Sequence, residues 1–123
     1  MKRLFDLLVV LIVLGLQDPV ATTGVSATHP VDVSVRPSVA LAPATVWVNA
    51  FVFPSTDNRA LEVSVMSSED EGRLSLEPLD EDSAIQHLFE YKDLGAGDYH
   101  VRACVTRVTG ADVCAVARLV ITE

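Results

Sequence analysis

The chain has 123 residues, the size of one ordinary domain, and half of these residues are hydrophobic, so it can bury a substantial core. Its formal net charge is −8, its pI is about 4.7, and it contains only nine Lys and Arg residues. Nucleic-acid backbones and anionic lipid surfaces attract clustered positive charge, so this balance argues against both as partners.

The first 27 residues have the pattern of a secretory signal peptide. Lys2 and Arg3 precede an unbroken apolar run, Leu7–Leu16, and small residues follow it. The run has ten residues, whereas a helix that spans a bilayer needs about 20. We therefore expect residues 1–27 to direct export to a periplasm or out of the cell, with cleavage between residues 21 and 27. Contact with a membrane is expected only in the alternative case, an uncleaved anchor.

Residues 28–30 read as a linker, and residues 31–123 as one domain in which apolar and polar residues alternate. "VDVSVRP" and "ALEVSVMS" each place three apolar side chains on one face, and the other face is polar in the first segment and carries Glu62, Ser64 and Met66 in the second. The further candidate strands are "ATVWVNAFVFP", "RLSL", "IQHLFEY", "DYHVRACVTR" and "DVCAVARLVIT", and turn-forming residues separate them. About seven short strands with this spacing predict an all-β fold, an immunoglobulin-like antiparallel β-sandwich.

The segment "DLGAGDYHVRACV" places Leu94, Gly97 and Tyr99 ahead of the alternating Val101 and Ala103. This arrangement resembles the penultimate strand of bacterial extracytoplasmic immunoglobulin-like and fibronectin-III-like modules, and "PSVALAPATVWVNAFVFPSTDNRALEVSV" resembles their opening strands. The resemblance covers nearly all of residues 31–122. It implies that the Tyr99 hydroxyl bonds back to the local backbone, and it implies a fold but no particular activity. Antibody-type domains have a cysteine where this chain has Val101, so the domain is not of that type.

Both cysteines lie in the last two predicted strands. If Cys104 stands opposite Cys114 in a hairpin, Arg107 closes on Ala111, and Val108-Thr109-Gly110 forms a three-residue loop with Gly110 in the left-handed region. This register gathers apolar residues on one face. It also puts the cysteines on a non-hydrogen-bonded rung, where the Cα atoms are close enough for a disulfide. We therefore predict an outward-facing Cys104–Cys114 disulfide, in keeping with an oxidising compartment.

A metal site and a redox centre are the other common uses of a cysteine pair. Two cysteines do not complete a tetrahedral zinc site, and His100 lies four residues along the strand from Cys104. A redox centre usually has the C-x-x-C spacing at a helix start, whereas nine residues separate these cysteines. A surface bridge that reductants can open is the alternative to a purely structural one.

Patterns that indicate catalysis are sparse. His29 lies in the linker, and His87 and His100 lie on different predicted strands. No G-x-S-x-G motif and no local Ser–His–Asp set accompanies them. We therefore predict no enzymatic activity and no cofactor.

Two acidic loops are weak candidates for calcium binding, because converging loops could supply several carboxylate oxygens. The residues concerned are Glu69, Asp70, Glu71, Asp80 and Asp82. Neither loop has the D-x-D-x-D-G spacing of a calcium ladder. The alternative is that both are solvated loops that keep the domain soluble.

The segment "ATVWVNAFVFP" is the most distinctive predicted surface. Its small and branched residues should face the core, which leaves Trp47, Asn49, Phe51 and Phe53 on the opposite face. An exposed aromatic face is a candidate binding patch, unless a loop, the linker or a bulge covers it. We therefore expect an exported, non-enzymatic module that binds an unidentified protein partner or has a structural or adhesive role at the cell envelope. The alternative is an accessory module that binds carbohydrate or calcium.

Overall fold

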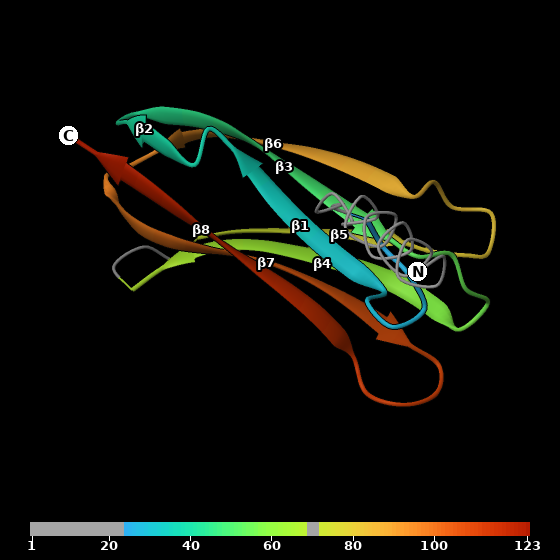
Figure 1. The fold of residues 1–123 in the computed structure, drawn as a ribbon. Coiled ribbons are helices and arrows are strands. Elements are labelled where there is room, and N and C mark those ends of the chain that lie inside the picture. The colour runs from blue at the N-terminus through green and yellow to red at the C-terminus, as the bar shows by residue number, and fades with distance from the viewer. Residues whose placement is uncertain (1–23, 69–71) are drawn as a thin grey trace, which may run out of the picture.

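The computed structural model describes residues 24–68 and 72–123 (Figure 1). The predicted signal peptide falls almost wholly on residues 1–23, outside the described ranges, so its export function stays a prediction. In the part of the chain that is described, no helix has the length and apolar character needed to cross a membrane.

The described residues form eight β-strands in two layers (Figure 1). The strands are β1 (Val31–Arg36), β2 (Val39–Leu41), β3 (Ala44–Val52), β4 (Asn58–Ser67), β5 (Arg73–Pro78), β6 (Gln86–Leu94), β7 (Gly97–Arg107) and β8 (Val113–Thr122). One sheet has the order β1-β3-β6, and the other has the order β2-β8-β7-β4-β5. All pairings are antiparallel except that of β2 with β8, which is parallel. The immunoglobulin-like all-β sandwich expected from the sequence is therefore confirmed.

The additional strand is β2, which the sequence prediction of about seven strands did not include. Pro37 and Pro43 bracket it, so the chain leaves the three-stranded sheet after β1 and joins the edge of the five-stranded sheet. Three residue pairs with β8, starting at Val39↔Val120, hold it there. Three residues between two prolines show too little alternation to be recognised as a strand.

The core lies between the inner faces of the two sheets. On β3, Val46, Val48 and Ala50 are fully buried at 0% exposure, as the alternation predicts. Opposite them, β4 and β7 bury a second set: Leu61, Val63, Val65, Val101, Ala103 and Val105. Each valine that is fully buried stabilises the fold by roughly 1.5–3 kcal/mol relative to an exposed one. This layer of branched side chains fixes which face of every strand points outward.

Tyr99 stands at the corner where the chain enters β7. Its side chain is buried, and its hydroxyl donates a hydrogen bond to the carbonyl oxygen of Gly95 at 2.8 Å. Leu94, at the end of β6, is fully buried beside this corner. The bond back to the local backbone that the family resemblance implied is therefore present.

The β7–β8 hairpin has the predicted register. Cys104 stands opposite Cys114, and the two form a disulfide with a Cα–Cα distance of 4.1 Å. The apolar pairs also agree with the prediction, from Ala103↔Ala115 to Tyr99↔Leu119. The disulfide lies on the outer side of the five-stranded sheet, because the neighbouring residues Ala103 and Val105 point into the core.

The predicted three-residue hairpin loop is wrong. The ladder ends at Val105↔Val113, so Arg107 does not close on Ala111, and residues 108–112 connect the strands. Gly110 does adopt the expected left-handed backbone, with a φ of 82°. The loop is longer because its residues bond to another part of the chain instead of across the hairpin.

Asp57, in the loop between β3 and β4, makes those bonds. The Val108 N–H donates to the Asp57 carbonyl oxygen at 2.8 Å, and the Thr109 N–H donates to the Asp57 carboxylate at 2.9 Å. Arg107 Nε donates to the same carboxylate at 3.1 Å, which completes an ion pair. The Thr109 N–H, the Thr109 hydroxyl and the Arg107 charge together lower the pKa of Asp57, although partial burial opposes them. Asp57 thus ties the hairpin loop to β4.

Candidate binding surfaces

The outer face of the three-stranded sheet carries the predicted aromatic residues. Register places the outward side chains in three rows: Arg36–Trp47–Glu90, Ser34–Asn49–Leu88 and Asp32–Phe51–Gln86. We call this surface the Trp47 face. Its centre is the outward side of β3, and β1 and β6 supply its two flanks.

Side chains at the middle of the Trp47 face are accessible. Trp47 is 42% exposed and Leu88 is 62% exposed, while Asn49 and Phe51 are half-buried. Gln86 Nε2 donates a hydrogen bond to Asn49 Oδ1 at 2.8 Å. This bond holds the Asn49 amide between the row of Trp47 and the row of Phe51. No element within residues 24–68 and 72–123 covers Trp47 or Leu88.

Phe53 lies just past the end of β3 and does not share the strand geometry of Trp47 and Phe51. Its N–H donates to the Pro30 carbonyl oxygen at 2.8 Å, and its carbonyl oxygen accepts a bond from Asn58 Nδ2 at 3.0 Å. Its side chain is 36% exposed. The structure therefore brings together Trp47, Asn49 and Phe51, and it places Phe53 at the margin of the set.

Leu88 is a member of this surface that the sequence prediction missed. The segment "IQHLFEY" has apolar residues on both faces, so alternation alone does not say which side faces out. The pairing of β6 with β3 decides it, because Asn49↔Leu88 puts Leu88 on the same side as Trp47. Only the register between strands far apart in sequence supplies that information.

A shallow hollow of about 470 Å³ lies on the same sheet, on the side of Phe51. Polar side chains dominate its lining: Asp32, Ser34, Arg36, Asn49 and Gln86. Phe51 and Val33 provide the apolar part of the lining. The Trp47 face thus combines a flat aromatic region with an adjacent polar depression.

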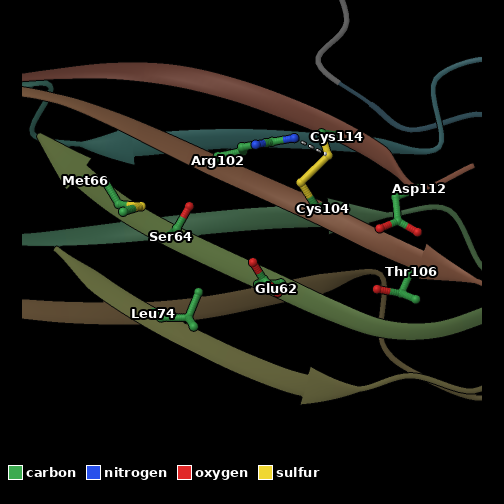
Figure 2. A pocket seen from close by; sticks show the side chains of 9 residues that line it. All are labelled: Glu62, Ser64, Met66, Leu74, Arg102, Cys104, Thr106, Asp112 and Cys114. Carbon is green, nitrogen blue, oxygen red and sulfur yellow. Dashed lines mark hydrogen bonds between the residues drawn. A yellow bond between two sulfur atoms is a disulfide. The ribbon is translucent and has the colours of Figure 1, made fainter. Parts of the chain in front are cut away.

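The outer face of the five-stranded sheet, which we call the Leu74 face, carries exposed apolar side chains among polar ones. The apolar side chains include Met66, Leu74, Leu76 and Val116, which are between 48% and 69% exposed. The disulfide lies on this side too, beside a hollow of about 480 Å³ (Figure 2). The alternation of apolar and polar residues did not predict this surface.

On β5 the polar side chains point inward and the leucines point to solvent, which is the reverse of the other strands of this sheet. The polar residues of β5 point to β6: the Tyr91 hydroxyl donates to Ser75 Oγ at 2.9 Å, and His87 Nδ1 lies 3.1 Å from Glu77 Oε1. Burial raises the pKa of Tyr91, and the bond to Ser75 opposes that rise. Leu74 is therefore left pointing to solvent. Alternation in "RLSLEP" identifies the two faces of β5, but the register of β5 against β4 decides which one faces out.

Only one of the two acidic loops lies within the described residues, so calcium binding by the pair of loops stays a prediction. Glu69, Asp70 and Glu71 lie outside the described ranges. Asp80 Oδ1 accepts hydrogen bonds from the Asp82 N–H at 2.8 Å and from Ser83 Oγ at 3.3 Å, so its carboxylate shapes the local turn. Within residues 24–68 and 72–123, no group of three or more His, Cys, Asp or Glu side chains is arranged to hold a metal ion.

The three histidines lie apart. His29 is exposed before β1, His87 is buried beside Glu77, and His100 is exposed on β7 next to Met66 and Arg118. The structure does not bring any two of them together.

Comparison with known proteins supports the fold and assigns no activity. No protein-family model matches the chain, and no curated protein does so either. A CARDB domain from Pyrococcus furiosus, solved in complex with di-metal ions, is similar in structure with a TM-score of 0.51 and 13% identity, over 75% of this chain and 90% of that one. The superoxide reductase (neelaredoxin) of Ignicoccus hospitalis gives a TM-score of 0.51 and 14% identity, over 76% and 80%.

An fn3 domain of the human collagen alpha-1(XX) chain is also similar, with a TM-score of 0.45 and 16% identity, over 85% of this chain and 90% of that one. At such low identity, the two likenesses with a TM-score of 0.51 concern the β-sandwich and no activity. The function has to be argued from the surfaces of this chain.

Proposed function

We propose that the protein is an exported, non-enzymatic immunoglobulin-like module that binds a protein partner through the Trp47 face. The observation that supports this most strongly is the exposure of Trp47, the single tryptophan of the chain, on the middle strand of the three-stranded sheet. Tryptophan is the residue most enriched at the energetic centres of protein interfaces, because it buries a large area at a small cost in side-chain entropy.

The arrangement around Trp47 fits a protein partner. Leu88 and Phe51 extend the apolar centre, while Arg36 and Glu90 stand on either side of Trp47 in its own row. An apolar centre with charged side chains at the rim is the usual composition of a protein interface. Because the rim carries charges of both signs, Arg36 against Glu90 and Asp32, we expect a partner surface that is itself of mixed charge around an apolar centre.

Export is the second part of the proposal. The pattern of residues 1–27 supports it, and the disulfide supports it independently, because such bonds persist mainly in oxidising compartments. Cell fractionation tests this part. Recovery of full-length protein with two reduced thiols in the cytoplasm would contradict it.

Carbohydrate binding is the second candidate, because the hollow beside Phe51 combines an aromatic wall with Asn49, Gln86 and Asp32. Aromatic stacking together with amide and carboxylate hydrogen bonds would suit a sugar ring. Neutral glycans should then bind the wild type and fail to bind a Phe51→Ala variant, whereas Trp47→Ala, which does not line the hollow, should still bind them. A protein partner should bind whether or not it is glycosylated.

Partner capture from the envelope or the medium of the native host tests the leading proposal. The wild-type protein, a Trp47→Ala variant and a Met66→Ala control serve as baits under oxidising conditions. Met66 is a matched control, since it is 48% exposed and lies on the opposite sheet. We expect Trp47→Ala to weaken capture of the specific partner by at least about tenfold, the typical effect of losing a central aromatic. Capture that survives Trp47→Ala and fails with Met66→Ala would overturn the assignment.

A further inference from the structure

The disulfide lies in an asymmetric electrostatic environment. Arg102 reaches diagonally along the hairpin and donates a hydrogen bond from Nη2 to Cys114 Sγ at 3.4 Å (Figure 2). On the other side, Glu62 of β4 stands directly opposite Cys104 in the next strand pairing. The Cys114 sulfur therefore has a guanidinium beside it, whereas the β4 residue paired with Cys104 carries a carboxylate that lines the same hollow as the bridge.

This asymmetry matters for thiol–disulfide exchange, in which one sulfur is attacked and the other leaves as a thiolate. A neighbouring arginine stabilises a thiolate and makes it a better leaving group. A neighbouring carboxylate has the opposite effect. Cys114 is therefore the favoured leaving sulfur, and Cys104 is the sulfur that an incoming thiolate should attack.

The surface shape allows that attack. An incoming sulfur approaches in line with the S–S bond, on the side away from the leaving sulfur. Since the order of strands is β8-β7-β4, the in-line path to Cys104 passes over β4. The hollow of about 480 Å³ lies there, lined by Glu62, Ser64, Met66 and Leu74 as well as by the bridge itself (Figure 2).

We infer that the Cys104–Cys114 bridge is a thiol–disulfide exchange site that accepts a neutral or cationic thiol. The thiolate bonds to Cys104 Sγ, the S–S bond breaks, and Cys114 leaves as a thiolate next to Arg102. A second thiolate then attacks the sulfur of the bound thiol and releases Cys104. Two thiols are oxidised to one external disulfide, and their two electrons and two protons reduce the bridge to two cysteine thiols.

Charge selects the thiol. Glu62 borders the in-line path, and the chain as a whole carries −8, so an anionic thiol is repelled on approach. Exposure alone would favour attack on Cys114, which is exposed while Cys104 is half-buried. The neighbouring charges therefore predict attack on Cys104, whereas solvent exposure alone predicts attack on Cys114.

The first experiment maps the sulfur that is attacked. The oxidised full-length protein is treated briefly with 2-mercaptoethanol, new thiols are alkylated, and the protein is digested with trypsin. Cleavage after Arg107 separates residues 103–107, which contain Cys104, from residues 108–118, which contain Cys114. We expect the mercaptoethanol adduct mainly on the first peptide and the alkyl group mainly on the second. An adduct found equally on both, or mainly on Cys114, would overturn the inference.

Variants of Arg102 test the leaving group. Arg102→Gln should slow the exchange by about three- to tenfold and even out the two adducts, whereas Arg102→Lys, which keeps the charge, should react nearly as fast as the wild type. Arg118→Gln is the matched control, since it removes an exposed arginine from the same outer face without touching the bridge. Circular dichroism verifies that each variant is folded. Exchange by Arg102→Gln at the wild-type rate would contradict the assignment.

A series of three thiols tests the selection by charge. We expect the rate constant per thiolate to fall from cysteamine to 2-mercaptoethanol to 3-mercaptopropionate. Glu62→Gln should narrow this spread, chiefly by accelerating 3-mercaptopropionate. If the rate constants of the three thiols differ as much in Glu62→Gln as in the wild type, Glu62 does not repel anionic thiols, and the selection by charge is contradicted. These results are independent of the Trp47 face, because Trp47→Ala should leave every rate unchanged.

Discussion

Replacing both cysteines of the β7–β8 bridge, in a Cys104→Ser/Cys114→Ser variant, should destabilise the domain by a calculable amount. The bridge closes a loop with a sequence separation of 10 residues. In the chain-entropy model, a loop of about this size contributes roughly 2.5 kcal/mol to stability at 25 °C, because it restricts the unfolded chain. For a domain of about 100 residues, that corresponds to a fall in Tm of roughly 10–20 °C.

Equilibrium urea unfolding followed by far-UV circular dichroism measures this loss. If the bridge acts through the unfolded chain, the m-value should rise, since the unfolded variant exposes more surface. Reduction of the wild-type protein by dithiothreitol should give the same midpoint as the double variant. A loss below about 1 kcal/mol would refute the reasoning. It would mean that the unfolded chain is already restricted in this segment without the bridge, so that the bridge removes little further entropy.

Three further predictions follow from single side chains. Tyr99→Phe should cost about 1 kcal/mol of unfolding free energy, since it removes the bond to the Gly95 carbonyl and leaves the packing intact; unchanged urea unfolding would contradict this. The pKa of Asp57 is lowered in the folded state, so its contribution is fully present above its usual pKa of 3.8 and is lost as pH falls through the lower folded-state value. Below pH 3.8, Tm should therefore fall more steeply for the wild type than for Asp57→Asn, and parallel curves would exclude this role. Because Trp47 is 42% exposed, acrylamide should quench its fluorescence efficiently in the folded protein, and quenching no greater than for a buried indole would contradict its placement.

The sequence predicted the parts of the fold that depend on local alternation. Val46, Val48 and Ala50 were expected on the inner side of their strand, and they are buried there. The hairpin register could also be predicted, because pairing Cys104 with Cys114 places apolar residues on one face and polar residues on the other.

Features that depend on contacts between distant segments could not be predicted from the sequence. The hairpin loop differs from the prediction because Asp57, about fifty residues earlier, bonds to Val108 and Thr109. The outward direction of Leu74 depends on its pairing with Ser64 of β4 and on the bond that Tyr91 of the other sheet makes to Ser75. Neither contact leaves a periodic signal in its own segment, since one is set by the pairing of β4 with β7 and the other by the stacking of the two sheets.

The candidate binding surface shows the same division. Alternation placed Trp47, Asn49 and Phe51 on one face, and the structure does so too. Leu88 joins them only through the register of β6 against β3. A binding surface on a sheet is assembled across strands, so one strand's sequence supplies only its central column.

Site-specific photo-crosslinking in the living host tests the central claim, binding through the Trp47 face, most directly. A photoreactive amino acid replaces Leu88 in one variant and Leu76 in the other. Both positions are accessible, at 62% and 69% exposure, but they lie on opposite outer faces of the sandwich. We predict a discrete crosslinked partner from position 88 and none of the same mass from position 76. The same partner captured from position 76 and not from position 88 would contradict the account.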